Sequence, residues 1–433
     1  MRSANMKSYF TLTTHLMSLI ICSFIYGQTV AIKAGHLIDP ANGKASKDQI
    51  ILVEDEKITA VGADIDISTA DEVIDLSNSW VLPGLIDAHV HMTFGLPPYV
   101  KTNSDWEMYF LKESTAYRAL RGMRKSIEAL EAGFTTLKDI GNDANYAMID
   151  VRKAIEAGYF VGPTLLTSGK IIAAFGGQSS GFSPEQGAFW QYEYIDADTP
   201  DEIRKAVRRN IYYGANTIKL VADNGIFFYT EDEIKAAVTE THNAGLTISI
   251  HVYGGQAATN VINAGPESIE HGFALSDEQL KLMKEKGIFL VGTDFPEEHL
   301  KAMGSSDAKA KKTANQVIDR LKRAHKIGVK MAFGTDVILD LPGMTRGQMA
   351  LDYLKVWQAA GIPPAKILKC MTTNAAELLA VQKERGAIAP GQFADIIATP
   401  ENPLENIETL KKVHFVLKEG SVIKHKKKKF TSK

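Results

Sequence analysis

The stretch PGLIDAHVHM, Pro83 to Met92, places two histidines one residue apart directly after an apolar run. The chain has only 11 histidines in 433 residues, so this pair stands out. Side chains alternate between the two faces of a β-strand, so His89 and His91 point to the same side. Two imidazoles on one face can hold one metal ion. The stretch therefore predicts a strand that ends at a metal site.

Seven further short apolar runs follow, and amphipathic helical segments separate them. The runs are FTTLKDIG (from Phe134), TLLTSG (Thr164), NTIKLVA (Asn216), LTISIHV (Leu246), ESIEHG (Glu267), IFLVGT (Ile288) and KMAFGTD (Lys330). The helices carry start and stop signals: Thr230 and Glu233 form a capping box, and Thr199 with Pro200 begins another helix that Gly214 ends. Strands that alternate with helices are typical of parallel sheets. The eight strands predict an α/β fold of the TIM-barrel, (β/α)8, type.

The two ends of the chain have a different pattern, in which short apolar stretches alternate with turn residues. Asn42 and Gly43 are a strong hairpin signal. Residues 28–82 and 384–433 together predict a small composite β-sandwich domain built from both termini. Residues 83–383 then form the TIM-barrel domain.

The first residues resemble a secretory signal. Arg2 and Lys7 precede the apolar run LMSLIICSFIYG, Leu16 to Gly27, which is short for a membrane span. Residues 1–27 are therefore expected to be a signal peptide, the chain to be exported to the periplasm or secreted, and membrane contact to occur only through this segment. An uncleaved anchor and lipid attachment at Cys22 are weaker alternatives.

The composition is that of a globular protein that acts on small molecules. The formal net charge is -2, from 49 basic and 51 acidic residues, so no overall attraction to nucleic acid is built in. Without the signal peptide, Cys370 is the only cysteine, so no internal disulfide is expected. Homo-oligomerisation stays open.

The predicted strand ends carry polar residues in a combination that coincidence explains poorly. Catalytic groups of TIM barrels sit at the carboxyl ends of the strands. An ammonium between Ile218 and Leu220 would be costly to bury without a partner. The strand ends present His89, His91, Lys219, His251, His271 and Asp336. Together these residues predict a metal site.

These motifs resemble those of the amidohydrolase superfamily of metal-dependent hydrolases. The similar motifs, in the family's order, are PGLIDAHVH, TIKL, ISIHVYG, SIEHG, FGTD, TTNAAELL (from Thr372) and GAIAPGQFADIIA (from Gly386). The segment from Tyr194 to Leu290 is most similar to the imidazolonepropionase-like or Xaa-Pro dipeptidase-like branch. Studied members of that branch hydrolyse dipeptides and N-acyl amino acids.

A lysine at the end of strand four implies, by this resemblance, the binuclear subtype. Carbon dioxide would convert Lys219 to a carbamate that bridges two divalent ions, with zinc the metal that imidazole and carboxylate ligands favour. One ion would be held by His89, His91 and Asp336, and the other by His251 and His271.

The resemblance also implies a mechanism, in which a metal-bridged hydroxide attacks the scissile carbonyl. Asp336 would pass the proton of the attacking water to the leaving amine. Tyr229 and Tyr253 are candidates for substrate orientation, and Arg346 for pairing with a substrate carboxylate. The expected enzyme is an exported amidohydrolase, similar to a dipeptidase or carboxypeptidase, with a dipeptide or N-acyl amino acid as substrate.

Two features concern the substrate pocket. Gln178, in FGGQSSG, stands where the branch often has a histidine in a Gly-Gly-His-Gly motif. The segment from Ile171 to Thr199 is long and rich in Gly, Ser and aromatic residues, which predicts a lid or a pocket wall.

Other functions share parts of this pattern. A cyclic-amide hydrolase or a lactonase could use the same metals, whereas a deaminase or a true imidazolonepropionase generally works with one metal and lacks the bridging lysine. Some barrels of the superfamily have lost ligands and become non-enzymatic interaction proteins. Here all six ligand positions are filled, which favours an enzyme.

Overall fold

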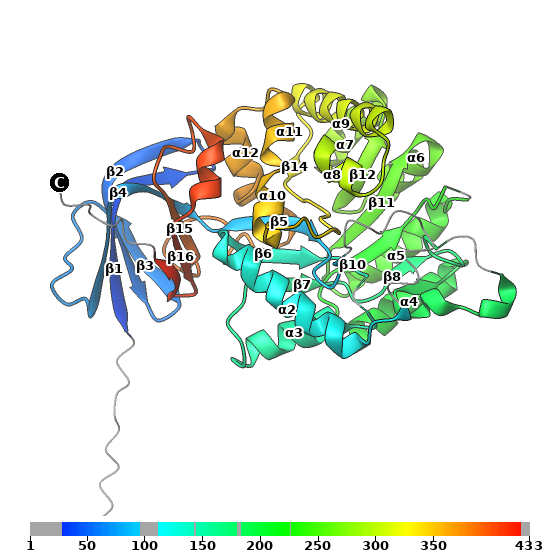
Figure 1. Ribbon diagram of the computed structural model, residues 1–433, viewed down its shortest axis with the longest axis horizontal. Helices are drawn as coiled ribbons and strands as arrows, with labels where there is room; N and C mark the ends of the chain where they lie inside the picture. Colours follow the sequence, from blue (N-terminus) through cyan, green and yellow to red (C-terminus); the bar gives the residue numbers. More distant parts are fainter. Residues whose placement is uncertain (1–27, 96–110, 143, 180–182, 226, 426–433) are drawn as a thin grey trace, which may run out of the picture.

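A computed structural model describes most of the chain (Figure 1). The described residues are 28–95, 111–142, 144–179, 183–225 and 227–425. The predicted signal peptide, residues 1–27, lies outside them. Among the described helices, none combines the length and apolar character needed to cross a membrane.

The two ends of the chain build one sheet, as the sequence predicts. Its seven strands have the order β17-β16-β15-β4-β1-β2-β3. Gly43, with φ of 68°, lies in the turn between the first two strands. In Figure 1 blue and red strands lie side by side, because β4 pairs with β15. The strands are β1 (Thr29–Asp39), β2 (Lys44–Glu54), β3 (Lys57–Gly62), β4 (Glu72–Pro83), β15 (Ile396–Thr399), β16 (Phe415–Lys418) and β17 (Ser421–His425). A two-layered sandwich stays a prediction.

All eight predicted parallel strands are confirmed as strands. They are β5 (Leu85–Val90), β6 (Phe134–Asp139), β7 (Thr164–Thr167), β10 (Ile218–Val221), β11 (Ile248–Gly254), β12 (Ser268–Ala274), β13 (Phe289–Val291) and β14 (Met331–Ala332). Two short strands that were not predicted, β8 (Ile171–Ala173) and β9 (Tyr194–Asp196), extend one edge. The pairing gives a three-stranded sheet, β5-β6-β7, and a seven-stranded sheet, β14-β13-β12-β11-β10-β8-β9.

Backbone hydrogen bonds outside the strand ladders join these two sheets. Ala88 N donates to Phe333 O at 2.9 Å, beyond β14, and Asn216 N donates to Thr167 O at 3.1 Å, at the end of β7. The arrangement is therefore TIM-barrel-like, and full closure into an eight-stranded ring stays a prediction.

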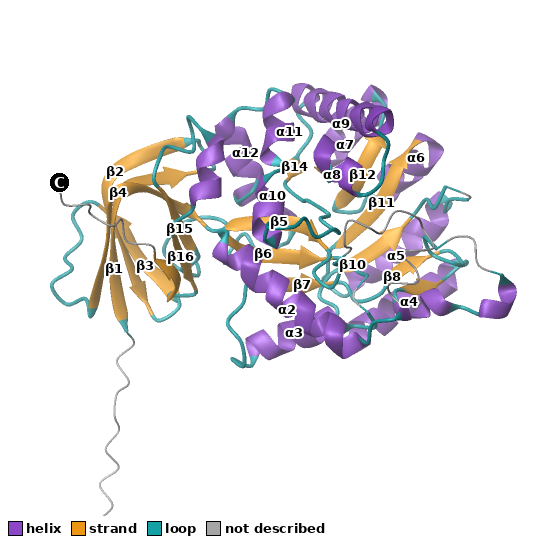
Figure 2. Ribbon diagram, in the orientation of Figure 1, coloured by secondary structure: helices purple, strands orange, loops and turns teal. Residues whose placement is uncertain are grey.

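Helices cover the outside of the parallel strands (Figure 2). The predicted capping box of Thr230 and Glu233 is present at the start of α5, and Thr199 caps α4. The α-helices are α2 (Thr115–Glu131), α3 (Ala147–Glu156), α4 (Pro200–Tyr213), α5 (Glu231–Asn243), α6 (Gly255–Ala264), α7 (Asp277–Lys286), α8 (Glu297–Ala302), α9 (Asp307–Ile327), α10 (Arg346–Leu351), α11 (Leu354–Ala359), α12 (Pro364–Cys370) and α13 (Thr373–Leu378). The 3-10 helices are η1 (Pro184–Gln186), η2 (Phe189–Tyr192) and η3 (Ile407–Lys412).

The parallel strands are buried on both faces. Every residue of β5, β6 and β10 is buried, as expected for strands with an enclosed interior on one side and helices on the other. A polar side chain on such a strand therefore needs a partner. The strand ends are where these partners meet.

Candidate metal centre

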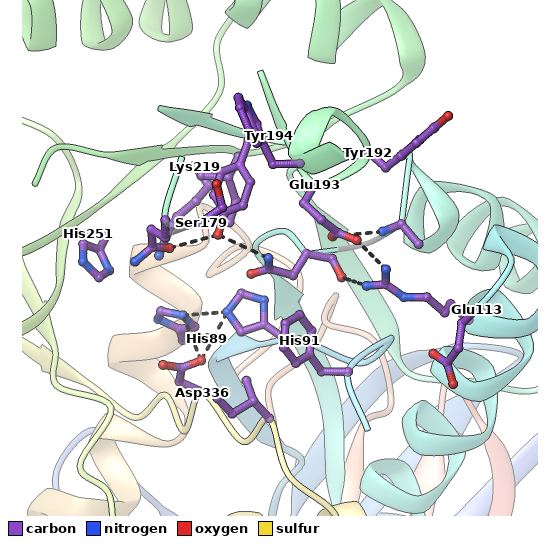
Figure 3. Close-up of a pocket in the computed structure, with 18 of the residues that line it drawn as sticks. His89, His91, Glu113, Ser179, Tyr192, Glu193, Tyr194, Lys219, His251 and Asp336 are labelled. Carbon is purple, nitrogen blue, oxygen red and sulfur yellow. Dashed lines mark hydrogen bonds and ion pairs between the residues drawn. The ribbon is translucent and has the colours of Figure 1, made fainter. Parts of the chain in front are cut away.

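The predicted ligands meet at the carboxyl ends of the parallel strands (Figure 3). They come from β5, β10, β11, β12 and the segment after β14. One cavity of about 780 Å³ is lined by all of them, namely His89, His91, Lys219, His251, His271 and Asp336. Positions spread over almost 250 residues of sequence thus share one site.

Three of these side chains are in close contact. His89 Nε2 lies 3.3 Å from His91 Nε2, and His91 Nε2 lies 3.2 Å from Asp336 Oδ1. The ligand atoms of His89, His271 and Asp336 all lie within 4.8 Å of one another. These spacings suit donors that converge on a small cation.

Hydrogen bonds on the far side of the rings orient two histidines. His89 Nδ1 lies 2.6 Å from Glu270 Oε2, and His91 Nδ1 lies 2.7 Å from Gly141 O. Carboxylate and carbonyl oxygens only accept, so Nδ1 is the donor in both rings and a neutral ring presents a bare Nε2 lone pair. The two Nε2 atoms lie close together, so a proton or a metal cation bound there would satisfy them.

The charges around His91 also favour a cation. Burial acts to lower the pKa of His91, but the Asp336 carboxylate outweighs it and the pKa is raised. This corner of the site therefore attracts positive charge, which a divalent ion supplies more strongly than a proton.

His251 provides the clearest test of whether a metal fits. Its Nε2 is buried and has no hydrogen-bond partner among the described residues. Burial, and then the charge of Lys219, lowers the pKa of His251 to about 3, so the ring is neutral at physiological pH. A buried ring nitrogen without a hydrogen-bond partner is costly, and metal coordination would satisfy it. The nitrogen and oxygen donors match those that zinc prefers.

Lys219 is the cationic member of the group. Its side chain is almost fully buried. Burial lowers the pKa of Lys219 to about 8, although Glu270 and Asp336 act in the opposite direction. The neutral amine is therefore more populated near neutral pH than in an exposed lysine, although the protonated form still predominates at pH 7.

The backbone at the site is strained. His271, Thr293 and Asp336 have φ values of 68°, 49° and 54°. Residues with a Cβ rarely adopt this left-handed conformation, and each instance costs about 1–3 kcal/mol. Thr293 Oγ1 in turn hydrogen-bonds His271 Nδ1 at 2.7 Å. The surrounding packing therefore holds these side chains in directions that a relaxed backbone would not give.

Asp87 links the first strand to the last. Its carboxylate accepts hydrogen bonds from Thr335 Oγ1 at 2.7 Å and from Thr335 N at 3.0 Å. His89 N also donates to it, at 3.1 Å. The segment that carries Asp336 is thereby held against His89.

The comparisons with known proteins agree with this geometry. The model of the amidohydrolase family matches residues 80–423. The chain belongs to the amidohydrolase family. It is a hydrolase that acts on carbon–nitrogen bonds. Ochratoxinase from Aspergillus niger is 30% identical over 445 aligned residues, which cover 94% of this chain and 89% of that protein.

Solved structures of the family also resemble this amidohydrolase. A Xaa-Pro dipeptidase with bound methionine in the active site has a TM-score of 0.79 and 27% identity, over 92% of this chain and 100% of that chain. The A. niger ochratoxinase structure has a TM-score of 0.78 and 28% identity, over 92% and 96%. The resemblance to the amidohydrolase superfamily is thus confirmed.

The structure places one of the three predicted substrate residues of this amidohydrolase in the cavity. Tyr253 lines the cavity, 40% exposed, with its ring 4.7 Å from that of His251. Tyr229 does not line it. Its side chain is buried and its hydroxyl donates to Ala197 O at 2.5 Å. The prediction for Tyr229 is therefore wrong, because its ring packs in the core.

Arg346 needs the same correction. Its side chain is buried, and its guanidinium donates to Val337 O and, at 2.7 Å, to Phe94 O. It does not line the large cavity. These bonds hold the loop after β14 against the end of β5, so Arg346 supports the site from behind instead of meeting a substrate.

The segment 171–199 forms a wall of the cavity, as predicted. It contains two short strands and two 3-10 helices, so it is more ordered than a plain loop. Gln178, at the position of the unusual motif, accepts a hydrogen bond from the Tyr194 hydroxyl at 3.2 Å. The described residues of this segment that line the cavity are Ile171, Gln178, Ser179, Phe189, Trp190, Tyr192, Glu193 and Tyr194.

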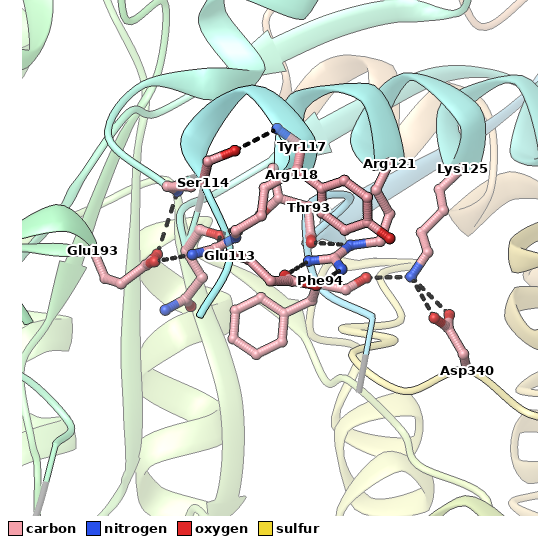
Figure 4. A network of polar contacts seen from close by, with 12 residues as sticks. Thr93, Phe94, Glu113, Ser114, Tyr117, Arg118, Arg121, Lys125, Glu193 and Asp340 are labelled. Carbon is pink, nitrogen blue, oxygen red and sulfur yellow. Dashed lines mark hydrogen bonds and ion pairs between the residues drawn. The ribbon is translucent and has the colours of Figure 1, made fainter. Parts of the chain in front are cut away.

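Sequence reasoning missed the buried ion pair that anchors this wall (Figure 4). Arg118, on α2, forms an ion pair with Glu193 and donates to Asn142 O at 2.8 Å. Beside it, Lys125 Nζ donates to Asp340 Oδ1 at 2.7 Å. Nothing in the local pattern of α2 marks these residues, because their partners lie far along the chain.

Glu270 and Asp87 were also missed, although a signal existed. Each is an acidic residue inside a strand motif that holds a predicted ligand, SIEHG or LIDAHVH. A carboxylate in a buried strand is costly unless it is paired. That cost marks both as partners of the histidines.

Proposed function

We propose that this amidohydrolase is a binuclear zinc enzyme that cleaves the amide bond of dipeptides or N-acyl amino acids. The observation that carries the proposal is the buried Nε2 of His251, which has no hydrogen-bond partner among the described residues, on a side chain that lines the same cavity as the five other predicted ligands. The ligand division follows the sequence prediction: one ion on His89, His91 and Asp336, the other on His251 and His271.

Lys219 completes the proposed site as a bridging carbamate. Its neutral amine attacks carbon dioxide and releases one proton, which converts a buried cation into an anion with two oxygen ligands. The buried position and the lowered pKa of Lys219 both support this reaction. The carbamate also removes the cost of a buried ammonium.

In this proposal the two ions would supply an activated water and a polarised carbonyl. Asp336 accepts the proton of the attacking water at a carboxylate oxygen and delivers it to the nitrogen of the leaving amine. The Tyr253 hydroxyl, at the cavity surface, donates a hydrogen bond to the carbonyl oxygen as negative charge develops there. The Phe189–Tyr192 wall excludes water from the substrate side.

The cavity wall supports a substrate with a bulky apolar group. Its apolar lining includes Phe94, Phe189, Trp190, Tyr192, Phe273 and Phe295. An ochratoxinase-like activity is therefore a second candidate, which the similarity to the A. niger enzyme over 94% of the chain also favours.

A substrate screen with a metal assay tests these candidates. The purified chain, loaded with zinc, is expected to hold about two zinc ions and to hydrolyse N-acyl amino acids, dipeptides or ochratoxin. Hydantoins and lactones serve as contrast substrates. Hydrolysis of lactones alone, or a well-folded chain that binds no metal, would refute the proposal.

The proposal extends to location and domain organisation. Residues 1–27 direct export to the periplasm or the medium, and deletion of this segment is expected to retain the protein inside the cell in a fractionation experiment. Residues 28–82 and 384–433 form the composite β domain, and residues 83–383 form the closed barrel. The sheet with strands from both termini supports this division.

A further inference from the structure

A chain of hydrogen bonds runs through the interior of the parallel sheets behind His89. Lys138 Nζ lies 2.5 Å from Ser249 Oγ, and Ser249 Oγ lies 2.9 Å from Ser268 Oγ. Ser268 Oγ lies 2.5 Å from Glu270 Oε1, whose second oxygen contacts His89 Nδ1 at 2.6 Å. The chain thus joins side chains from β6, β11, β12 and β5.

The burial of this chain makes it unusual. Each of its five side chains is at most 1% exposed, and Lys138 is fully buried. The interior of such a fold is normally filled by branched apolar residues, and a buried ammonium is costly. Lys138 does not line the cavity, so it does not contact a substrate. An effect transmitted through its hydrogen-bonded neighbours would explain why a lysine occupies this buried position.

The chemistry of the two ends sets the direction of every proton. An ammonium only donates, so Ser249 Oγ accepts from Lys138 and uses its own proton toward Ser268. Ser268 then donates to the Glu270 carboxylate, which only accepts. The other Glu270 oxygen accepts the proton of His89 Nδ1. Each hydroxyl makes one donation and one acceptance, so the hydrogen bonds from Lys138 to Glu270 all run in one direction.

We propose that Lys138 is a positioning residue for the metal centre, acting through Ser249, Ser268 and Glu270 to hold the His89 Nε2 lone pair toward the metal. This inference rests on the proposed metal-dependent function. The bonds from Lys138 through Ser249 and Ser268 fix the position of Glu270, and the Glu270 oxygen that accepts from Nδ1 keeps His89 in the tautomer that binds metal. Lys138, Ser249, Ser268 and Glu270 do not line the cavity, so they take no direct part in the reaction.

The test is the zinc affinity of the full chain, measured by competition with a chromophoric chelator. Lys138→Met keeps the length of the side chain and removes its charge, and it is expected to weaken zinc binding about 10- to 100-fold. Lys418→Met is the matched control. Lys418 is also buried and also donates to a carboxylate, Asp395 at 3.1 Å, but it lies in the terminal sheet. Its replacement is expected to leave zinc affinity unchanged.

A second variant interrupts the chain without removing a charge. Ser249→Ala is expected to weaken zinc binding. The double variant Lys138→Met/Ser249→Ala is expected to bind zinc no more weakly than Lys138→Met, because both substitutions break the same series of hydrogen bonds. The absorption bands of the cobalt-loaded protein, which report ligand geometry, should change in both variants and not in Lys418→Met. Thermal unfolding of each variant in the presence of a chelator measures the stability of the metal-free fold independently of zinc binding.

The outcomes separate this inference from the proposed function. If Ser249→Ala binds zinc as tightly as wild type, the hydrogen-bond series from Lys138 to His89 does not position the metal ligand. This test holds even if Lys138→Met does not fold. Tight zinc binding by every variant overturns only this inference. A wild-type chain that binds no zinc overturns both.

Discussion

Two buried polar clusters of this protein differ in how well their groups are paired. Between the terminal sheet and the parallel strands, Asp395 forms ion pairs with Arg385 at 2.6 Å and with Lys418 at 3.1 Å. Lys418 also pairs with Glu419 at 2.7 Å. At the strand ends, His251 Nε2 has no hydrogen-bond partner among the described residues, and the Nε2 atoms of His89 and His91 lie 3.3 Å apart. Both clusters hold buried charge.

The difference indicates what each cluster is for. A fully paired network fixes one arrangement of the elements around it and needs nothing more. A buried cluster with unpaired acceptors is unstable alone, and it persists where a ligand completes it. The first cluster therefore concerns folding and the second concerns chemistry. Substitutions in the two clusters should separate stability from activity.

The largest expected effect is on activity, from Lys219→Ala. The substitution removes the proposed bridge between the ions, so amide hydrolysis should be abolished and the zinc content should fall below two per chain. A small carboxylate such as acetate should restore part of the activity, because it can bridge two metals. The measurements are kcat/KM with and without acetate, and bound zinc. Full activity of the variant would refute the binuclear site.

The matching change in the paired cluster is Arg385→Met. It leaves the buried Asp395 without one of its two cations, so the free energy of unfolding should fall by about 3–5 kcal/mol. The kcat of the folded protein should not change. Urea denaturation and steady-state kinetics measure the two quantities. Arg204→Met, which removes an exposed ion pair with Asp201, is the control and should cost at most about 1 kcal/mol.

The pH dependence of stability should report the burial of Lys219. In the folded, metal-free chain, burial lowers the pKa of Lys219 from its usual 10.5 to about 8. Between these pH values the unfolded chain holds the proton and the folded chain does not, so the free energy of unfolding rises with pH. For a fully buried group the contribution is about 3 kcal/mol.

Lys219→Met isolates this contribution. The variant should be more stable than wild type at pH 7.5, and the difference should shrink as the pH approaches 10.5. Urea denaturation in the presence of a chelator measures both proteins. A difference that does not change with pH would show that Lys219 keeps an ordinary pKa.

The sequence predicts the eight strands and the six ligand positions because both depend on short-range patterns. Strand period and position at a strand end place His89, His91 and Asp336 without knowledge of the fold around them. Partners across the interior cannot be found this way. The motif SIEHG marks Glu270 as a buried carboxylate that needs a partner, but its partner His89 lies 181 residues away. Lys138 lies 111 residues from Ser249, and only the folded chain shows that it is linked to the site.

Loop side chains were the other failure. Tyr229 and Arg346 follow strands in the sequence, which makes them candidates for the cavity. Their direction depends on acceptors elsewhere, Ala197 O for the tyrosine and Phe94 O for the arginine. A loop side chain turns inward when its polar group can hydrogen-bond a buried carbonyl, and the local sequence does not predict the position of that carbonyl.

The smallest predicted effect concerns a residue that combines both kinds of environment. The Trp190 indole N–H is paired with Asp196 at 2.9 Å, while its ring lines the cavity. Trp190→Ala should raise KM about tenfold for substrates with a bulky apolar group, because about 1.4 kcal/mol of contact is lost. The kcat and the zinc content should not change, since no ligand is touched. Trp190→Phe keeps an aromatic ring and is the control. An equal loss of kcat in both variants would show that this wall, like the strand ends, takes part in the chemistry.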